Sequence, residues 1–261
     1  MATKKYKNYL IDLDGTMYRG TEKITEAHDF IKRAIDDSEV NYFFLTNNTT
    51  KTPQQVADNL TNNHDIPASV DQIITPSLAT AFYLRQQSDD LSQKSAYVIG
   101  EVGLKKAVFA TGIQLNEFDP DFVIVGLDTD VTYHKFELAT LAIKRGAKFI
   151  GTNADTNLPN ERGMVPGAGS VISLVETSTQ QKAMYIGKPD QPILDFAISK
   201  FGLNKSETIM VGDNYNTDIR CGLDNGVDSL LVYTGVSTKE DILNQTHKPT
   251  FEIDDLSEWE F

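Results

Sequence analysis

The chain has 261 residues, of which 40% are hydrophobic and 23% charged, with a formal net charge of -13 at pH 7. This length allows one large α/β domain or two smaller ones, and the acidity argues against a nucleic-acid-binding surface, which needs clustered lysine and arginine. The single cysteine, Cys221, excludes an intramolecular disulfide. No stretch approaches the ~20 consecutive apolar residues of a membrane span, so we expect a cytoplasmic protein with no membrane partner.

The first part of the chain alternates short apolar runs with longer amphipathic stretches, the pattern of parallel strands joined by crossover helices. Residues 9–11 predict a buried strand that leads into the acidic sequence DLDGT, and residues 41–45 predict a second strand that stops at Thr46. A helix is predicted over residues 25–37, and Pro53 predicts the start of another. The side chains expected on the buried face of the first helix are Ala27, Phe30, Ile31, Ala34 and Ile35.

The same alternation starts again at about residue 77 and continues toward the C-terminus. Strands are predicted over residues 96–99, 122–125, 148–150, 184–186 and 208–211, and helices over residues 133–144 and 193–201. Residues 151–169 are rich in glycine, asparagine and proline and predict a long loop. The chain as a whole therefore predicts an α/β fold built on parallel strands.

Polar residues with catalytic chemistry follow four of the predicted strands: Asp12, Thr46, Lys188 and Asp213. In open parallel sheets a ligand binds outside the carboxyl ends of the strands. We therefore expect four strands of one sheet to bring these residues to one crevice, although they are far apart in the sequence. An anionic substrate on so acidic a chain would need local positive groups, such as a metal ion, a lysine or helix N-termini.

Asp12 and Asp14 place two carboxylates at one strand end, an arrangement that is costly unless a cation binds there. Mg²⁺ is the cation we expect, because it prefers oxygen ligands and usually takes one or two carboxylates together with water and substrate phosphate. Gly15 would allow a tight turn and a close approach of the backbone to a ligand. The alternative is an ordinary Asp-Gly turn after a strand.

The remaining signals each have a structural alternative as well. Thr46 offers a hydroxyl and, with Asn47, backbone N–H groups for phosphate oxygens, but it could instead cap a helix. Lys188 could bind phosphate and the nucleophile together, or it could be a solvated surface charge. Asp213 and Asp218, in the sequence GDNYNTD, are expected to be metal-site acids, although this sequence could also form a loop that leads into a helix.

The sequences DLDGT, LTNN, GKP and VGDNYNTD resemble motifs one to four of the haloacid dehalogenase (HAD) superfamily and stand in the same order, from Asp12 to Asp218. The residue two positions after the nucleophile separates the branches of that superfamily. In having aspartate at this position, Asp14, the chain resembles the phosphatases and phosphomutases. The dehalogenases and phosphonatases lack an acid there, and the ion-pumping ATPases carry threonine. The resemblance implies a Rossmann-like, HAD-like core with a parallel sheet.

The resemblance also implies a mechanism. Asp12 attacks phosphorus and forms an aspartyl-phosphate, while Asp14 acts first as general acid toward the leaving alkoxide and then as general base for water. Thr46, Asn47 and Lys188 hold the phosphoryl oxygens.

A Mg²⁺ site is implied in the same way. The ion would be bound by the Asp12 carboxylate, the Asp14 backbone carbonyl and Asp213, with Asp218 acting directly or through water. It would keep Asp12 ionised and offset the repulsion between that carboxylate and an incoming phosphate.

The interval between Thr46 and Lys188 is far longer than one βαβ unit requires, so it predicts a domain of its own. We expect an α/β cap over residues 78–181 and a catalytic core made of residues 1–77 and 182–261. A cap between motifs two and three resembles the NagD and 4-nitrophenylphosphatase-like subfamily, and the sequences FLTNN, VGLD and GTNADT look like that group. The alternative is a structural or oligomerising insert that does not contact substrate.

Cap residues select the leaving group in that subfamily, and the loop at residues 151–169 is the candidate segment, because long polar loops on rigid scaffolds tend to carry recognition. Asn153 and Asp155 could form hydrogen bonds with a polar substrate. They could equally serve as Asx-turn residues.

Together these features predict a Mg²⁺-dependent phosphomonoesterase that hydrolyses a small phosphorylated metabolite of the nucleotide, sugar or aryl phosphate type. Two alternatives stay open. One is a phosphotransferase or phosphomutase that uses the same intermediate, and the other is a non-catalytic binding protein with the HAD fold. A homodimer is a further expectation, because caps of this kind often mediate dimers.

Overall fold

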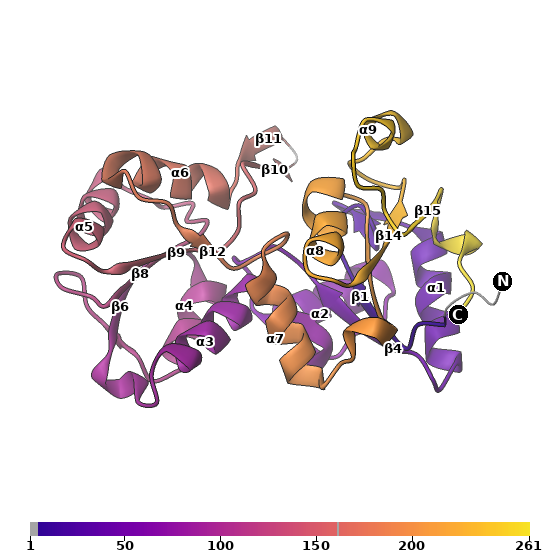
Figure 1. Ribbon diagram of the computed structural model, residues 1–261, viewed down its shortest axis with the longest axis horizontal. Coiled ribbons are helices and arrows are strands. Elements are labelled where there is room, and N and C mark those ends of the chain that lie inside the picture. The colour runs from indigo at the N-terminus through magenta and orange to yellow at the C-terminus, as the bar shows by residue number, and fades with distance from the viewer. Residues whose placement is uncertain (1–4, 161) are drawn as a thin grey trace. The chain divides into compact units, whose positions relative to one another are not determined.

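The computed structural model describes residues 5–160 and 162–261, and the chain folds into two compact units (Figure 1). The first unit contains the chain up to Thr46, Pro53–Ile74 and Lys188–Phe261, and the second contains Asn47–Thr52 and Thr75–Gly187. Each unit has a parallel β-sheet and helices of its own, so one α/β unit is inserted into the sequence of another. No helix within the described residues is long and apolar enough to cross a membrane.

The first unit is built on a six-stranded parallel sheet with the order β15-β14-β13-β1-β4-β5. Its strands are β1 (Asn8–Ile11), β4 (Asn41–Leu45), β5 (Ile73–Ile74), β13 (Thr208–Gly212), β14 (Asp228–Val232) and β15 (Phe251–Ile253). Because β1 lies between β13 and β4, the carboxyl ends of three strands from distant parts of the chain meet at one edge. A short antiparallel hairpin, β2 (Tyr18–Arg19) and β3 (Glu22–Lys23), follows β1.

The helices of the first unit connect these strands. They are α1 (Thr25–Asp36), α2 (Pro53–His64), α7 (Gln191–Phe201), α8 (Arg220–Leu223) and α9 (Lys239–Leu243). Helix α1 buries Phe30 completely, and its ring packs edge-on against Tyr9 of β1 with the ring centroids 5.9 Å apart. The prediction that Ile35 shares the buried face is wrong, because its side chain is 50% exposed. At about 100° per residue, Ile35 lies about 80° from Ala27 around the helix axis, at the edge of the buried stripe.

The second unit has a five-stranded parallel sheet with the order β12-β9-β8-β6-β7. Its strands are β6 (Ser95–Ile99), β7 (Gln114–Leu115), β8 (Phe122–Val125), β9 (Lys148–Gly151) and β12 (Met184–Tyr185), and its helices are α3 (Pro76–Gln87), α4 (Val102–Phe109), α5 (Tyr133–Lys144) and α6 (Ala168–Thr179). Figure 1 shows α5 and α6 next to each other, and buried side chains of both helices, Ala139 and Ile172, join Val123 of β8 in one apolar core.

Two predictions for this part of the chain are wrong. Residues 151–169 are not a loop throughout, because β10 (Asn157–Asn160) and β11 (Gly163–Pro166) form an antiparallel hairpin there; position 161 lies outside the described residues. Both strands contain proline together with asparagine or glycine, so they carry little strand signal. The strand before Lys188, β12, pairs with β9 of the second unit. Lys188 therefore does not follow a strand of the six-stranded sheet.

The buried face of α1 gives a prediction for stability. Phe30→Ala removes a fully buried ring that contacts Tyr9, and it should lower the free energy of unfolding by roughly 3–5 kcal/mol. Ile35→Ala on the same helix is the matched control, and it should lower that free energy by less than about 1 kcal/mol. Urea denaturation monitored by circular dichroism measures both changes. Equal losses would contradict the placement of these two side chains.

Candidate active site

Asp12, Thr46 and Asp213 lie at the carboxyl ends of the neighbouring strands β1, β4 and β13, and all three are buried. Sheet hydrogen bonds continue up to these positions. The Asp12 N–H donates to the Val211 carbonyl (2.8 Å), and the Thr46 N–H donates to the Ile74 carbonyl (3.1 Å). The parallel sheet thus fixes the backbone of these residues side by side and brings together three of the four residues that follow predicted strands.

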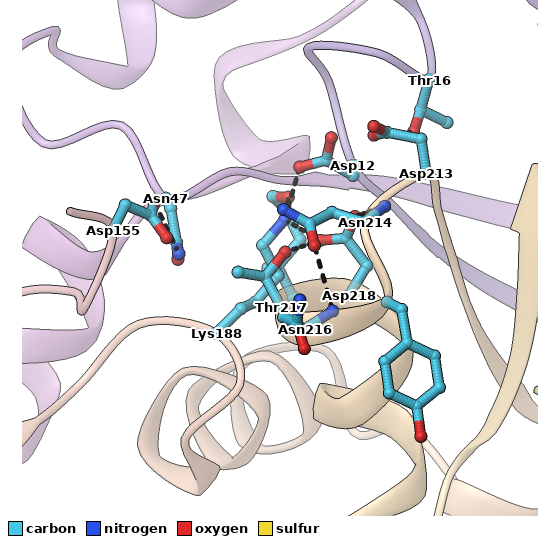
Figure 2. Close-up of polar contacts among 12 residues, drawn as sticks. Asp12, Thr16, Asn47, Asp155, Lys188, Asp213, Asn214, Asn216, Thr217 and Asp218 are labelled. Carbon is cyan, nitrogen blue, oxygen red and sulfur yellow. Dashed lines mark hydrogen bonds and ion pairs between the residues drawn. The ribbon is translucent and has the colours of Figure 1, made fainter. Parts of the chain in front are cut away.

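Lys188 reaches the same place by a different route. The chain returns from the second unit to the first at this residue, and its side chain is only 1% exposed. The ammonium contacts the carboxylate of Asp12, that of Asp218 (2.8 Å) and the Leu45 carbonyl (2.9 Å) (Figure 2). Burial by itself would lower the pKa of Lys188, but the carboxylates of Asp12 and Asp218 raise this pKa by more than burial lowers it. The pKa therefore lies above its ordinary value, and Lys188 is a fixed positive charge.

The surroundings of Asp12 disfavour its charged form, whereas those of Lys188 favour the ammonium. Burial raises the pKa of its carboxyl, the charge of Asp218 raises it again, and Lys188 only partly offsets both. The net pKa lies well above the ordinary value for aspartate. The site therefore holds more negative charge than the ammonium of Lys188 compensates.

Asp213 is oriented by neutral donors. The Thr16 hydroxyl donates to Oδ1 (3.1 Å), and the Val236 N–H donates to Oδ2 (2.7 Å). Gly15, whose φ is 96°, and Gly235 pack so closely on this carboxylate that a Cβ atom at either position would overlap with it. The backbone is thus shaped around the Asp213 carboxylate.

Asp218 lies on a π-helical turn, Tyr215–Ile219, that begins three residues after β13 ends. Such turns are frequent at functional sites. The Asn214 N–H donates to its Oδ2 (3.1 Å), and the Thr217 hydroxyl donates to its Oδ1 (3.2 Å), the oxygen that also contacts Lys188. Both oxygens of Asp218 therefore have fixed directions.

The carboxylates of Asp12, Asp213 and Asp218 form a buried cluster in which each offers an oxygen within 4.8 Å of the others. Burial, followed by the charge of Asp218, raises the pKa of Asp213 to about 6. With Lys188 included, three carboxylates and one ammonium leave two negative charges, which a divalent cation would neutralise. The donors are carboxylate oxygens, the ligands that Mg²⁺ prefers. The residues present therefore fit a divalent metal ion.

Asp14 differs from these acids because it is exposed. Asp14 lies between β1 and the β2–β3 hairpin, and its Oδ1 accepts from the N–H of Gly20 (3.1 Å), in the turn between β2 and β3. Its carboxylate lies outside the cluster of Asp12, Asp213 and Asp218. The expected metal contact of Asp14 through its backbone carbonyl therefore stays a prediction.

Asn47, Asn153 and Asp155 belong to the second unit and contact one another there. Asn47 Nδ2 donates to Asp155 Oδ2 (3.1 Å; Figure 2), and Asn153 Nδ2 donates to the Asn47 carbonyl (2.8 Å). The Asp155 N–H donates to Asn153 Oδ1 (3.1 Å), which forms an Asx turn. Asn153 is only 3% exposed, so the geometry favours the turn role for this residue. A substrate contact by Asp155 stays a prediction.

Sequence reasoning missed the groups that orient the acids. Thr16, Asn214 and Thr217 all lie inside the quoted motif sequences, but a motif does not tell which side chain faces a neighbouring carboxylate. A hydroxyl beside the Gly15 turn is the signal that could have pointed to Thr16. Val236 contributes a backbone N–H, which every residue except proline supplies, so no sequence signal could have identified it.

Comparison with known proteins extends these observations. Residues 9–114 match the haloacid dehalogenase-like hydrolase family, and residues 185–259 match a HAD-hydrolase-like family. The chain is 49% identical to the 5'-nucleotidase YutF of Bacillus subtilis, over 98% of each chain. It is 45% identical to an acid sugar phosphatase of Staphylococcus epidermidis, over 97% of this chain and 96% of that one. A double mutant of the thermostable NPPase from Geobacillus stearothermophilus is 47% identical, with a TM-score of 0.91 over 99% of each chain.

These similarities run through both units and agree with the order of the four motifs and with a NagD-like insertion between motifs two and three. The relatives named above are a nucleotidase and phosphatases. The chain belongs to the haloacid dehalogenase-like hydrolases, and it is a phosphoric monoester hydrolase.

Proposed function

We propose that this hydrolase is a Mg²⁺-dependent phosphomonoesterase in which the Asp12 carboxylate attacks phosphorus. The observation that carries the proposal is the buried contact of Asp12 with Lys188, beside the acids Asp213 and Asp218. It supports a nucleophilic role because Lys188 orients the Asp12 carboxylate and favours its ionised form, and a metal ion held by the neighbouring acids would keep it ionised. In this proposal the first unit is the catalytic core and the second unit is the cap.

The proposed reaction has two steps. In the first, an Asp12 oxygen forms a bond to phosphorus, the bond from phosphorus to the leaving alkoxide breaks, and Asp14 gives the alkoxide a proton. In the second, water attacks the phosphorus of the aspartyl-phosphate and loses a proton to Asp14, and the Asp12–phosphorus bond breaks to release inorganic phosphate. The exposure of Asp14 supports its role, because its carboxyl group must reach both the leaving group and water.

Negative charge on the phosphoryl oxygens needs fixed donors in both steps. Lys188, the Thr46 hydroxyl and the Asn47 backbone N–H would hold these oxygens. Bound Mg²⁺ would supply the charge that lowers the pKa of Asp12 and offsets its repulsion from phosphate. The groups that would hold the ion are Asp12, the Asp14 backbone carbonyl, Asp213 and Asp218, the last directly or through water.

The proposed substrate is a small phosphorylated metabolite of the nucleotide, sugar or aryl phosphate type. Relatives at 49%, 45% and 49% identity are named a 5'-nucleotidase, an acid sugar phosphatase and a p-nitrophenylphosphatase. Such different leaving groups at similar identity support a site that recognises the phosphoryl group first and tolerates variation beyond it.

Asp12→Asn tests the nucleophile. It removes the attacking charge while keeping the shape of the side chain, so kcat/KM for 4-nitrophenyl phosphate should fall by roughly three orders of magnitude or more. Asp36→Asn makes the same chemical change at an exposed position of α1, and it should keep the wild-type rate of phosphate release. An Asp12→Asn enzyme with full activity would remove Asp12 from the mechanism.

The metal site gives a second prediction. Chelation with EDTA should abolish phosphate release, and added Mg²⁺ should restore it. Thr16→Val deletes the hydroxyl that orients Asp213, so it should raise the Mg²⁺ concentration for half-maximal activity roughly ten- to a hundredfold. Thr61→Val, at an exposed position of α2, is the control. The proposed role of Asp213 fails if Thr16→Val leaves the Mg²⁺ requirement unchanged.

A further inference from the structure

The segment that follows Thr46 is built into the second unit although its neighbours in sequence belong to the first. Residues 47–52 form no helix or strand, so their backbone groups need partners elsewhere. The Thr50 carbonyl accepts from the Gly103 N–H of helix α4 (3.2 Å). This segment is therefore held in place by the second unit.

Asn47, the first residue of the segment, is held at two points. Its side-chain amide donates to Asp155 Oδ2 (3.1 Å), and its carbonyl accepts from Asn153 Nδ2 (2.8 Å). Fixing both the carbonyl and the side chain of one residue leaves few combinations of backbone and side-chain torsions. These contacts therefore constrain where the Asn47 backbone nitrogen lies, in the peptide that joins it to Thr46.

The two residues that hold Asn47 are themselves held by hydrogen bonds or lie next to a residue that is. The Asx turn ties the Asp155 N–H to Asn153, and the Gly169 N–H of α6 donates to the Asp155 carbonyl (2.8 Å). Thr152, one residue before Asn153, extends the ladder of β9 by donating to the Val125 carbonyl (2.9 Å). A sheet, a turn and a helix therefore support the contacts to Asn47.

We infer that Asp155 and Asn153 are positioning residues that act through Asn47 on the phosphoryl-binding peptide Thr46–Asn47. The inference rests on the proposed role of that peptide in holding phosphate. Donors stabilise a developing charge best when their direction is fixed before the substrate binds. Asp155 in this assignment serves phosphate binding in general and does not distinguish one leaving group from another.

Inorganic phosphate is the decisive probe, because it has no leaving group. Asp155→Ala should raise the inhibition constant of inorganic phosphate about tenfold, the effect expected when a hydrogen bond to a charged group is lost. It should lower kcat/KM by a common factor for 4-nitrophenyl phosphate, a nucleoside monophosphate and a sugar phosphate. Asp155→Asn keeps an acceptor oxygen and should restore most of the loss. Asp89→Ala, at an exposed position of the second unit, is the control.

A double-mutant cycle tests whether Asp155 acts through Asn47. Asn47→Ala removes the same hydrogen bond from its other end, so adding Asp155→Ala should raise the phosphate inhibition constant no further. If Asp155→Ala does not fold, Asp155→Leu, which also removes both acceptor oxygens but keeps the volume of the side chain, gives the same comparison with and without Asn47→Ala. Additive effects would overturn the inference. So would an unchanged inhibition constant together with losses that depend on the leaving group.

The proposed function and this inference fail in different ways. An enzyme that keeps full activity as Asp12→Asn loses the proposed mechanism, whatever Asp155 does. An enzyme that depends on Asp12 but binds inorganic phosphate equally well with and without the Asp155 carboxylate loses only the positioning role.

Discussion

The buried ammonium of Lys188 is the interaction on which the site depends. It contacts the carboxylates of Asp12 and Asp218 and the carbonyl that ends β4, and so it joins three separate parts of the first unit. A buried charge that loses its partner destabilises a protein strongly, so none of these groups can be removed without a large cost. Lys188 pairs with Asp12 and Asp218, whereas Asp213 accepts hydrogen bonds from neutral donors. The cluster of three acids therefore has excess negative charge, which explains why a divalent cation fits there.

Most of the core site could be predicted from the sequence because the rule behind it is topological. Residues after parallel strands gather at one sheet edge, and Asp12, Thr46 and Asp213 do so, on strands that pair directly or through β1. Lys188 also contacts this cluster, but it does not follow a strand of the same sheet. Its preceding strand has only two residues, Met184–Tyr185, and pairs with β9 in the other sheet. Sheet membership depends on such long-range pairing, which a local pattern does not contain.

The other differences have local causes. Apolarity alone placed Ile35 on the buried face of α1, although the helical period puts it at the edge of the stripe. The hairpin of β10 and β11 is built from sequence of low strand propensity, so only its pairing makes it a strand. The orientation of Asp213 depends on the Thr16 hydroxyl, for which the adjacent Gly15 turn is the only sequence signal, and on a backbone N–H, which no sequence pattern identifies. Sequence thus identified the acids but not the groups that aim them.

Trapping of the covalent intermediate tests the central claim most directly. The enzyme is mixed with a ³²P-labelled phosphomonoester, quenched in acid within the first turnover, digested and analysed by mass spectrometry. The account predicts one labelled peptide, with the phosphoryl group on Asp12 and with label that is lost in hydroxylamine, as expected for an acyl phosphate. Label on another residue, or rapid turnover with no labelled peptide at any quench time, would contradict it.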